Sequence, residues 1–125
     1  GEHNIVDKVK HLLSTPRERA YVVCACEQLP LFEKELEALA ASGRKTVLLT
    51  DREFPLAGEQ VKVYPDMQGG NQIGVIVDSR SALTGELGPD STNTCLYSGQ
   101  RNFVELYKRA LANEIELLKY RKGEK

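Results

Sequence analysis

The chain contains no tryptophan, and aromatic residues make up only 6% of its 125 residues. The tight, polar, aromatic-walled pocket expected for a sugar is therefore not evident. The chain also has no apolar run near the roughly 20 residues needed to cross a bilayer, and its start does not have the pattern of a signal peptide. These absences exclude a membrane span and favour a cytoplasmic protein without a membrane partner.

Neither sign of charge is in excess, since 17 basic and 18 acidic residues give a net charge of -1. The two signs are interspersed along the chain. Nucleic acid binding needs a concentrated basic surface, so this segment is not expected to bind nucleic acid. The hydrophobic share of 41% is ordinary for a globular chain, and the length predicts one domain over residues 1–125 with a modest core.

Cysteine and histidine are scarce. Cys24 and Cys26 lie two residues apart in a strand-like run and point to the same face, while Cys95 stands alone. Structural zinc needs four well-spaced ligands, and only His3 and His11 could complete a set. We expect no metal and no cofactor, and we interpret the cysteines as buried free thiols in a reducing cytosol.

The spacing of apolar residues defines the expected elements. Helices are predicted over 3–14, 29–43 and 101–120. Strands are predicted over 20–27, 45–51, 61–64, 72–77, 82–87 and 95–97, with a loop over 88–93. The first two strands and the helix between them form a right-handed βαβ unit, so these strands run parallel. The fourth and fifth form a hairpin with turn-forming residues at its tip.

The terminal helix is more apolar than one small sheet requires. Its broad apolar face comprises Val104, Tyr107, Leu111, Ile115 and Leu118, widened by Phe103, Leu106, Ala110 and Leu117. We therefore predict a homodimer, in which part of this helix, alone or with the opening helix, packs against a second copy.

The segment 71–86 carries a degenerate motif. It resembles the phospholipase D signature, in which His-x-Lys, four residues, Asp, six residues and Gly-Ser form two strands and a turn. Asn71 stands at the position of the nucleophilic His, and Ile73 stands at that of the phosphate-binding Lys. Asp78 and Gly85 match the signature, whereas Glu86 replaces the Ser.

This substitution pattern removes the chemistry of that family. A phosphodiester enzyme needs an imidazole for the covalent intermediate and a cation for the charged group, so we expect no catalytic residues. Asp78 is interpreted as structural, with its carboxylate bonding its own turn backbone. Gly85 is interpreted as a close backbone approach or a bulge.

The order of motifs along nearly the whole chain resembles the effector domain of the TrmB family of transcriptional regulators. The motifs are NIVDKV, YVVCACEQLPLFEKELEALAASG, KTVLLTD, the degenerate signature, YSGQRN and NEIEL. That family joins a winged helix-turn-helix to a phospholipase-D-like domain. The resemblance implies an α/β fold, namely an α/β/α domain with a mixed sheet and flanking helices. It also implies that DNA is bound only through an N-terminal domain that is missing here.

A ligand-binding cleft is expected beyond the carboxyl ends of the parallel strands. The predicted ligand-binding residues are Glu27, Asp51, Asn71, Glu86, Ser98 and Gln100. Carboxylates would suit an amine, and amides would add directional hydrogen bonds. In the alternative interpretation, Glu27 and Asp51 cap loops and helices, and Asn71 is a turn residue. Ser98 has no sequence-visible base, so it is not expected to be a nucleophile.

The leading hypothesis is a non-catalytic domain that senses an unknown small-molecule effector and dimerises within a transcription regulator. Ligand binding or dimer geometry would then set the spacing of two upstream DNA-reading helices. Two alternatives stay open, which are a phospholipase-D-type phosphodiesterase or nuclease, and a purely structural dimerisation module. The effector and the operator do not follow from the sequence.

Overall fold

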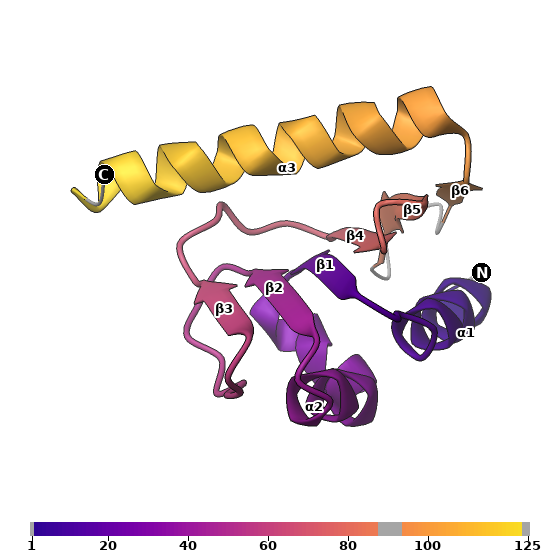
Figure 1. Cartoon of the computed structure of the whole chain (residues 1–125), viewed down its shortest axis with the longest axis horizontal. Helices are drawn as coiled ribbons and strands as arrows, with labels where there is room; N and C mark the ends of the chain where they lie inside the picture. Colours follow the sequence, from indigo (N-terminus) through magenta and orange to yellow (C-terminus); the bar gives the residue numbers. More distant parts are fainter. Residues whose placement is uncertain (1, 88–93, 124–125) are drawn as a thin grey trace.

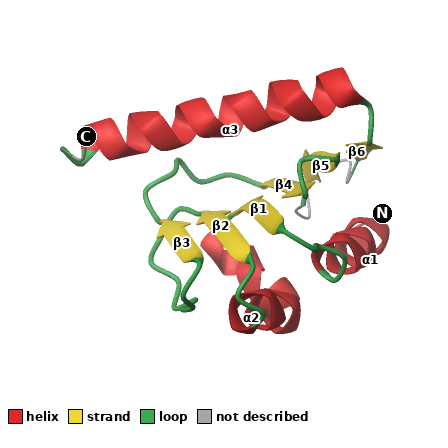
Figure 2. Cartoon of the chain, viewed as in Figure 1, coloured by secondary structure: helices red, strands yellow, loops and turns green. Residues whose placement is uncertain are grey.

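The chain folds into three layers, with a mixed sheet between helices (Figures 1 and 2). The computed structural model describes residues 2–87 and 94–123, so the loop expected over 88–93 lies outside the described residues. Helix α1 (Glu2–Leu13), the 3-10 helix η1 (Cys26–Phe32) and helix α2 (Glu33–Ala41) cover one face. Helix α3 (Arg101–Arg121) crosses the other face. The expected α/β/α architecture is confirmed.

The sheet contains six strands in the order β3-β2-β1-β4-β5-β6. The strands are β1 (Arg19–Cys24), β2 (Lys45–Leu49), β3 (Val61–Tyr64), β4 (Gln72–Val77), β5 (Ser81–Glu86) and β6 (Cys95–Ser98). β1 and β2 run parallel, as expected for the βαβ unit, and β3 is parallel to β2. β4, β5 and β6 pair antiparallel. Cys24 therefore lies opposite Ile73, so the carboxyl ends of the parallel strands share an edge with the start of β4.

Alternate residues of the central strands divide between two cores, because successive strand side chains point to opposite faces. The core on the α1 and α2 side includes Ile5, Val9, Val22, Phe32, Leu36, Leu48, Ile73, Val75 and Leu83. The core on the α3 side includes Val23, Val47, Leu49, Met67, Ile76, Ala82, Val104, Leu111 and Leu118. The sheet is thus buried on both faces around β1 and β4.

The segment after β1 differs from the expectation. The first strand ends at Cys24 rather than Glu27, because residues 26–32 form η1. Pro30 lies inside this 3-10 helix and has no N–H to donate, so regular α-helix begins only at Glu33. The predicted stop at Gly43 is confirmed, since its φ of 79° is in the left-handed region that favours glycine.

The cysteines occupy three different environments, and all three are free thiols. Cys24 is buried, Cys26 is partly buried and Cys95 is exposed, so the buried interpretation is right for Cys24 and wrong for Cys95. Cys95 begins β6, the outermost strand on its side of the sheet among the described residues, and its side chain is exposed. Burial, assisted by the negative charge of Asp51, raises the pKa of the Cys24 thiol to about 12. Its thiolate, and hence its reactivity, is suppressed at neutral pH.

Helix α3 carries two apolar stripes rather than one broad face. Val104, Leu111 and Leu118 are buried against the sheet. Leu106, Leu117 and Tyr120 are exposed by 63%, 43% and 73%. Across residues 2–87 and 94–123, no helix has both the length and the apolarity that spanning a membrane demands.

Candidate functional site

Asp51 lies at the carboxyl edge of β2, where its carboxylate caps η1. The Oδ1 atom accepts a hydrogen bond from the N–H of Cys26 at 2.8 Å. Gly69 approaches so closely that a Cβ there would lie 2.8 Å from the same carboxylate. The Cys26 N–H, with lesser help from Arg52 and Thr50, outweighs partial burial and lowers the pKa of Asp51. The capping interpretation of Asp51 therefore describes its position.

Three other predicted site residues lie along this edge. Asn71 precedes β4, and its carbonyl accepts a hydrogen bond from the N–H of Leu87 at 2.7 Å. Glu86 pairs with Gln72 across the hairpin. Glu27, in the first turn of η1, is exposed, as are Asn71 and Glu86. The fold thus brings together four of the six predicted ligand-binding residues.

Ser98 and Gln100 lie at the opposite edge of the sheet, so their predicted place in the cleft is wrong. β6 is antiparallel to β5, and Ser98 therefore pairs with Ala82 near the hairpin tip. Both side chains are engaged locally. The Ser98 Oγ accepts from the N–H of Gln100 at 2.9 Å, and the Gln100 Oε1 accepts from the N–H of Phe103 at 2.8 Å. Gln100 is the N-cap of α3.

Asp78 fixes the hairpin tip to the segment before β1. Its carboxylate accepts hydrogen bonds from the N–H groups of Arg17, Glu18 and Arg19 at 3.0, 2.8 and 3.0 Å. The structural role agrees with the sequence interpretation, but the bonded backbone belongs to residues 17–19 rather than to the turn. Burial alone would raise the pKa of Asp78, yet these three donors outweigh it and the pKa is lowered.

The hairpin tip itself has an unusual backbone. Asp78 and Ser79 both have positive φ, at 54° and 55°, and the N–H of Arg80 donates to the carbonyl of Val77 at 2.9 Å. This is the geometry of a type I′ turn, whose twist matches that of the flanking strands. Glycine is preferred at the second central position, where this chain has Ser79.

The remaining signature positions lie in the core and at a close backbone contact. Ile73, at the position of the phosphate-binding Lys, is fully buried and packs in the core on the α1 side. Gly85 is a close backbone approach, as expected, because a Cβ there would lie 2.7 Å from the carbonyl oxygen of Thr94. Among residues 2–87 and 94–123, no group of three His, Cys, Asp or Glu side chains could hold a metal ion.

The sequence reasoning missed a hollow between α3 and the sheet, which we call the α3 hollow. It has a volume of about 430 Å³ and is lined by Val23, Met67, Gln72, Tyr107, Ala110, Leu111, Asn113, Glu114 and Leu117. A second hollow, lined by Gln72, Thr84, Gly85, Glu86, Thr94, Cys95 and Leu96, shares Gln72 with it. Of the six predicted ligand-binding residues, only Glu86 lines either hollow.

Gly74 lies directly beneath Tyr107, one of the residues that line the α3 hollow. A Cβ at Gly74 would overlap the hydroxyl of Tyr107, so the missing side chain lets this ring lie against β4. The Tyr107 hydroxyl hydrogen-bonds Thr84, the residue that pairs with Gly74, and burial raises the pKa of Tyr107. A glycine within a predicted strand was the available signal for this close contact.

Solved structures with this arrangement of strands and helices are known. NucT from Helicobacter pylori superposes with a TM-score of 0.68 and 12% sequence identity, over 92% of this chain and 89% of NucT. TrmBL2, an archaeal chromatin protein reported to show a novel mode of DNA binding, gives a TM-score of 0.66 and 13% identity. This match covers 93% of the present chain and 50% of TrmBL2.

The chain has a phospholipase-D-like fold. No family model and no curated protein sequence matches it. The similarity to TrmBL2 and NucT agrees with the resemblance found in the sequence. At identities of 12% and 13%, this agreement concerns the fold alone. The chain spans about half the length of TrmBL2.

Proposed function

We propose that this chain is a non-catalytic regulatory domain that self-associates through α3 and binds a small-molecule effector beside that contact. The observation that carries the proposal is the second apolar stripe of α3, which borders the α3 hollow. The fold match to TrmBL2 supports a place within a DNA-binding protein, and the resemblance to the TrmB family implies a DNA-reading domain upstream. The spacing of two such domains would then follow from how two copies associate.

The degenerate signature supports a non-catalytic role. Asn71 has no nucleophilic nitrogen that could form a phosphoryl intermediate. Ile73 is fully buried and offers hydrocarbon where a cation would have to meet a phosphate. The remaining signature residues, Asp78 and Gly85, are engaged with the backbone of neighbouring segments. What remains of the motif is its hairpin geometry.

The stripe has the spacing of a coiled-coil seam. Leu106, Ala110, Asn113, Leu117 and Tyr120 follow one another at alternating steps of four and three residues along α3. All except Asn113 are apolar, and Leu106 and Tyr120 are more than half exposed. Burial against a second copy would remove this surface from water. A single Asn in such a seam can pair with the Asn of the partner helix and fix the register.

The charges that flank the stripe suit a parallel pair of α3 helices. Arg109 and Glu116 lie on one side of the stripe, and Glu114 and Arg121 lie on the other. In a parallel pair, each residue of the first side faces the residue five positions later on the other helix. Arg109 would then face Glu114 of the second copy, and Glu116 would face Arg121.

The α3 hollow couples a ligand to this contact. Ala110, Asn113 and Leu117 belong both to the stripe and to the hollow wall. A ligand in the hollow would therefore bind the associated and separated states with different affinity, and that difference is the coupling free energy. The lining is apolar with two amides and the carboxylate of Glu114, which suits a small apolar molecule that carries an amine.

Self-association is tested by placing a charge in the stripe. Leu117→Asp should weaken association by at least about tenfold, because a desolvated, unpaired polar group costs ~1–3 kcal/mol or more. Leu31→Asp is the matched control, since Leu31 on η1 is also 43% exposed but lies far from the stripe. Sedimentation equilibrium measures both. A wild-type chain that stays monomeric at high concentration would contradict the proposed self-association.

Effector binding is tested by thermal unfolding against a panel of sugars, nucleosides, amino acids, amines and metals. A ligand at 100 times its dissociation constant adds about 2.7 kcal/mol of stability. Glu114→Gln should abolish the response to amines, whereas Glu27→Gln at the sheet edge should preserve it. If no compound shifts the transition, the domain is a structural dimerisation module instead.

A phosphodiesterase or nuclease is the second candidate, because the NucT fold match covers nearly all of both chains. It predicts turnover of a generic phosphodiester such as bis(p-nitrophenyl) phosphate. Turnover lost in Asn71→Ala and retained in Glu27→Gln would favour this candidate over the regulatory one. A rate equal to the buffer background would exclude it for that substrate class.

A further inference from the structure

A second groove runs along α3 and shares no lining residue with the α3 hollow. Its main hollow has a volume of about 340 Å³ and is lined by Tyr21, Lys45, Val47, Lys62, Tyr64, Ala112, Ile115, Glu116 and Lys119. An adjoining hollow of about 260 Å³ is lined by Tyr21, Glu105, Lys108, Arg109 and Ala112. The two share Tyr21 and Ala112, and we call them together the lysine groove.

The floor of the groove is built by the parallel strands. Tyr21, Val47 and Lys62 lie side by side in one row across β1, β2 and β3. Tyr64 and Lys45 extend this face at the two ends of the strands. Because side chains two residues apart share a sheet face, all five point toward α3. The sequence pattern alone shows none of this, since these residues come from three separate segments.

The groove concentrates positive charge in a chain whose net charge is -1. Its lining contains five cationic side chains against two carboxylates, Glu105 and Glu116. Lys119 lies 3.9 Å from Glu116, whereas Lys45, Lys62 and Lys108 take part in no ion pair with any described residue. The interspersed charges of the sequence are therefore segregated in space, and three ammonium groups are available to an anion.

Two tyrosine rings lie directly beside these ammonium groups. The Lys45 Nζ is 5.6 Å from the centre of the Tyr21 ring, and the Lys62 Nζ is 5.4 Å from that of Tyr64. Both rings are only partly buried. An aromatic face next to a cation is the combination that binds a nucleotide, because the base stacks on the ring while the phosphate meets the ammonium.

We propose that the lysine groove binds a nucleotide, with a base stacked on Tyr21 and phosphates held by Lys45 and Lys62. The same chemistry is presented by a free nucleotide and by an unpaired stretch of single-stranded nucleic acid. A base-paired duplex does not fit, because its bases are stacked on one another and cannot reach a ring on the groove floor. Arg109 and Glu116 both line the groove and flank the stripe, but the proposed ligand contacts of Tyr21, Lys45 and Lys62 lie on the sheet, so this inference does not depend on self-association.

The test measures the binding of three probes by isothermal titration calorimetry at low salt. ADP and a short oligothymidylate represent the two sources, and tripolyphosphate carries charge without a base. We expect ADP, oligothymidylate or both to bind at least about tenfold more tightly than tripolyphosphate, since only these two probes carry a base that can stack on the ring. ADP binding identifies a free nucleotide as a ligand, and binding of oligothymidylate alone identifies a strand.

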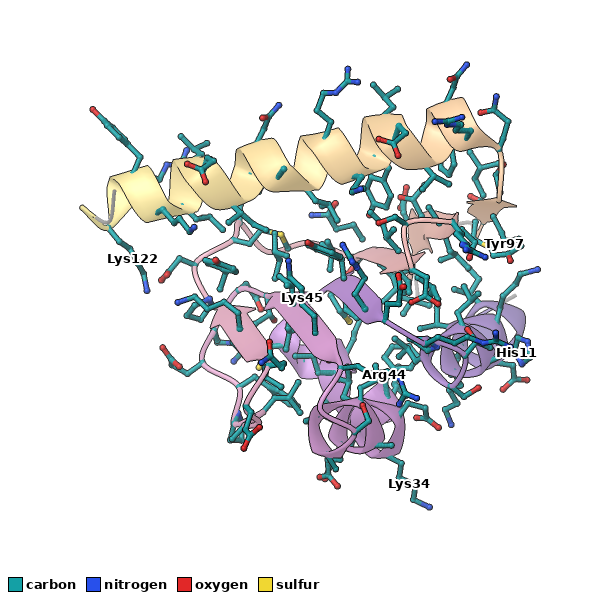
Figure 3. The ribbon with its side chains drawn as sticks, viewed as in Figure 1. His11, Lys34, Arg44, Lys45, Tyr97 and Lys122 are labelled. Carbon is teal, nitrogen blue, oxygen red and sulfur yellow. The ribbon has the colours of Figure 1, made fainter. Side chains whose placement is uncertain are left out.

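Variants assign the binding to the groove. The double variant Lys45→Glu with Lys62→Glu should weaken the binding of the probe by at least about tenfold, because two charge-assisted contacts to phosphate are replaced by repulsion. Lys34→Glu makes the same kind of change on α2, where Figure 3 shows Lys34 pointing away from the sheet and α3, and should leave binding unchanged. Tyr21→Leu should weaken ADP or oligothymidylate binding but not that of tripolyphosphate.

Three results would overturn the inference. These are the absence of binding by the wild-type chain, tripolyphosphate binding as tight as that of both base-containing probes, and an equal loss in Lys34→Glu. Thermal unfolding of each variant verifies that the exposed substitutions leave the fold intact. Sedimentation of the same lysine variants separates this question from self-association, because these charge changes on the sheet should leave association as in the wild type.

Discussion

At the residue scale, Ser79 is held in a backbone conformation that favours glycine. Its φ is 55°, and its hydroxyl is buried without a partner among the described residues. We expect Ser79→Gly to raise the free energy of unfolding by about 1 kcal/mol, since it removes a left-handed strain of ~1–2 kcal/mol at some cost in chain entropy. Urea unfolding measures the change. A decrease in stability would show that the turn does not have this geometry.

At Gly74 we expect a substitution to lower the stability of the fold. Gly74→Ala would place a methyl group against the Tyr107 hydroxyl and should destabilise the fold by about 1–3 kcal/mol, although alanine otherwise suits a strand better than glycine. Gly70→Ala is the matched control, because nothing lies within 4 Å of a Cβ there. In a Tyr107→Leu background the cost of Gly74→Ala should fall. Equal costs in both backgrounds would contradict the contact.

At the scale of elements, the sequence predicted the extent of α3 but not which of its apolar residues are exposed. Its extent and its excess of apolar residues followed from periodicity, because a helix repeats its faces every 3.6 residues. The division of that excess into a buried and an exposed stripe did not follow, since both have helical spacing. It depends on which face of α3 is turned toward the sheet, and Tyr107 packs against Gly74 on that face.

The exposed stripe predicts a specific effect of its central amide. Asn113→Leu should tighten self-association by about tenfold or more, because a polar residue in a seam fixes register at a cost in stability. The same variant should also form larger species, since the register would no longer be fixed. Sedimentation velocity resolves both effects. Association unchanged from the wild type would remove Asn113 from the contact.

Strand direction explains which predicted site residues meet. Asp51 and Asn71 lie at one edge, because the βαβ unit makes β2 parallel to β1, and β4 runs antiparallel to β1 and so starts where β1 and β2 end. Ser98 was misplaced because nothing in its own strand encodes whether β6 pairs parallel or antiparallel with β5. The hollows were missed for a related reason, since each is lined by segments far apart in the sequence.

At the scale of the whole molecule, two carboxylates link stability to pH. The folded pKa values of Asp51 and Asp78 lie below the ordinary value of 3.8, so their contribution is complete above that value. It is lost as the pH falls through the lowered folded values. We expect the free energy of unfolding to decrease below pH 4, and Asp78→Asn to reduce this slope. Urea titrations at a series of pH values measure both, and an unchanged slope would contradict the role of Asp78.

Three buried side chains, Val104, Leu111 and Leu118, recur every seven residues and lie along one line of α3. Phe103, Tyr107 and Ile115 pack against the same core on either side of this line. The sheet therefore fixes the rotation of α3 about its own axis as well as its position. That rotation in turn decides which side chains of the helix are left in contact with water.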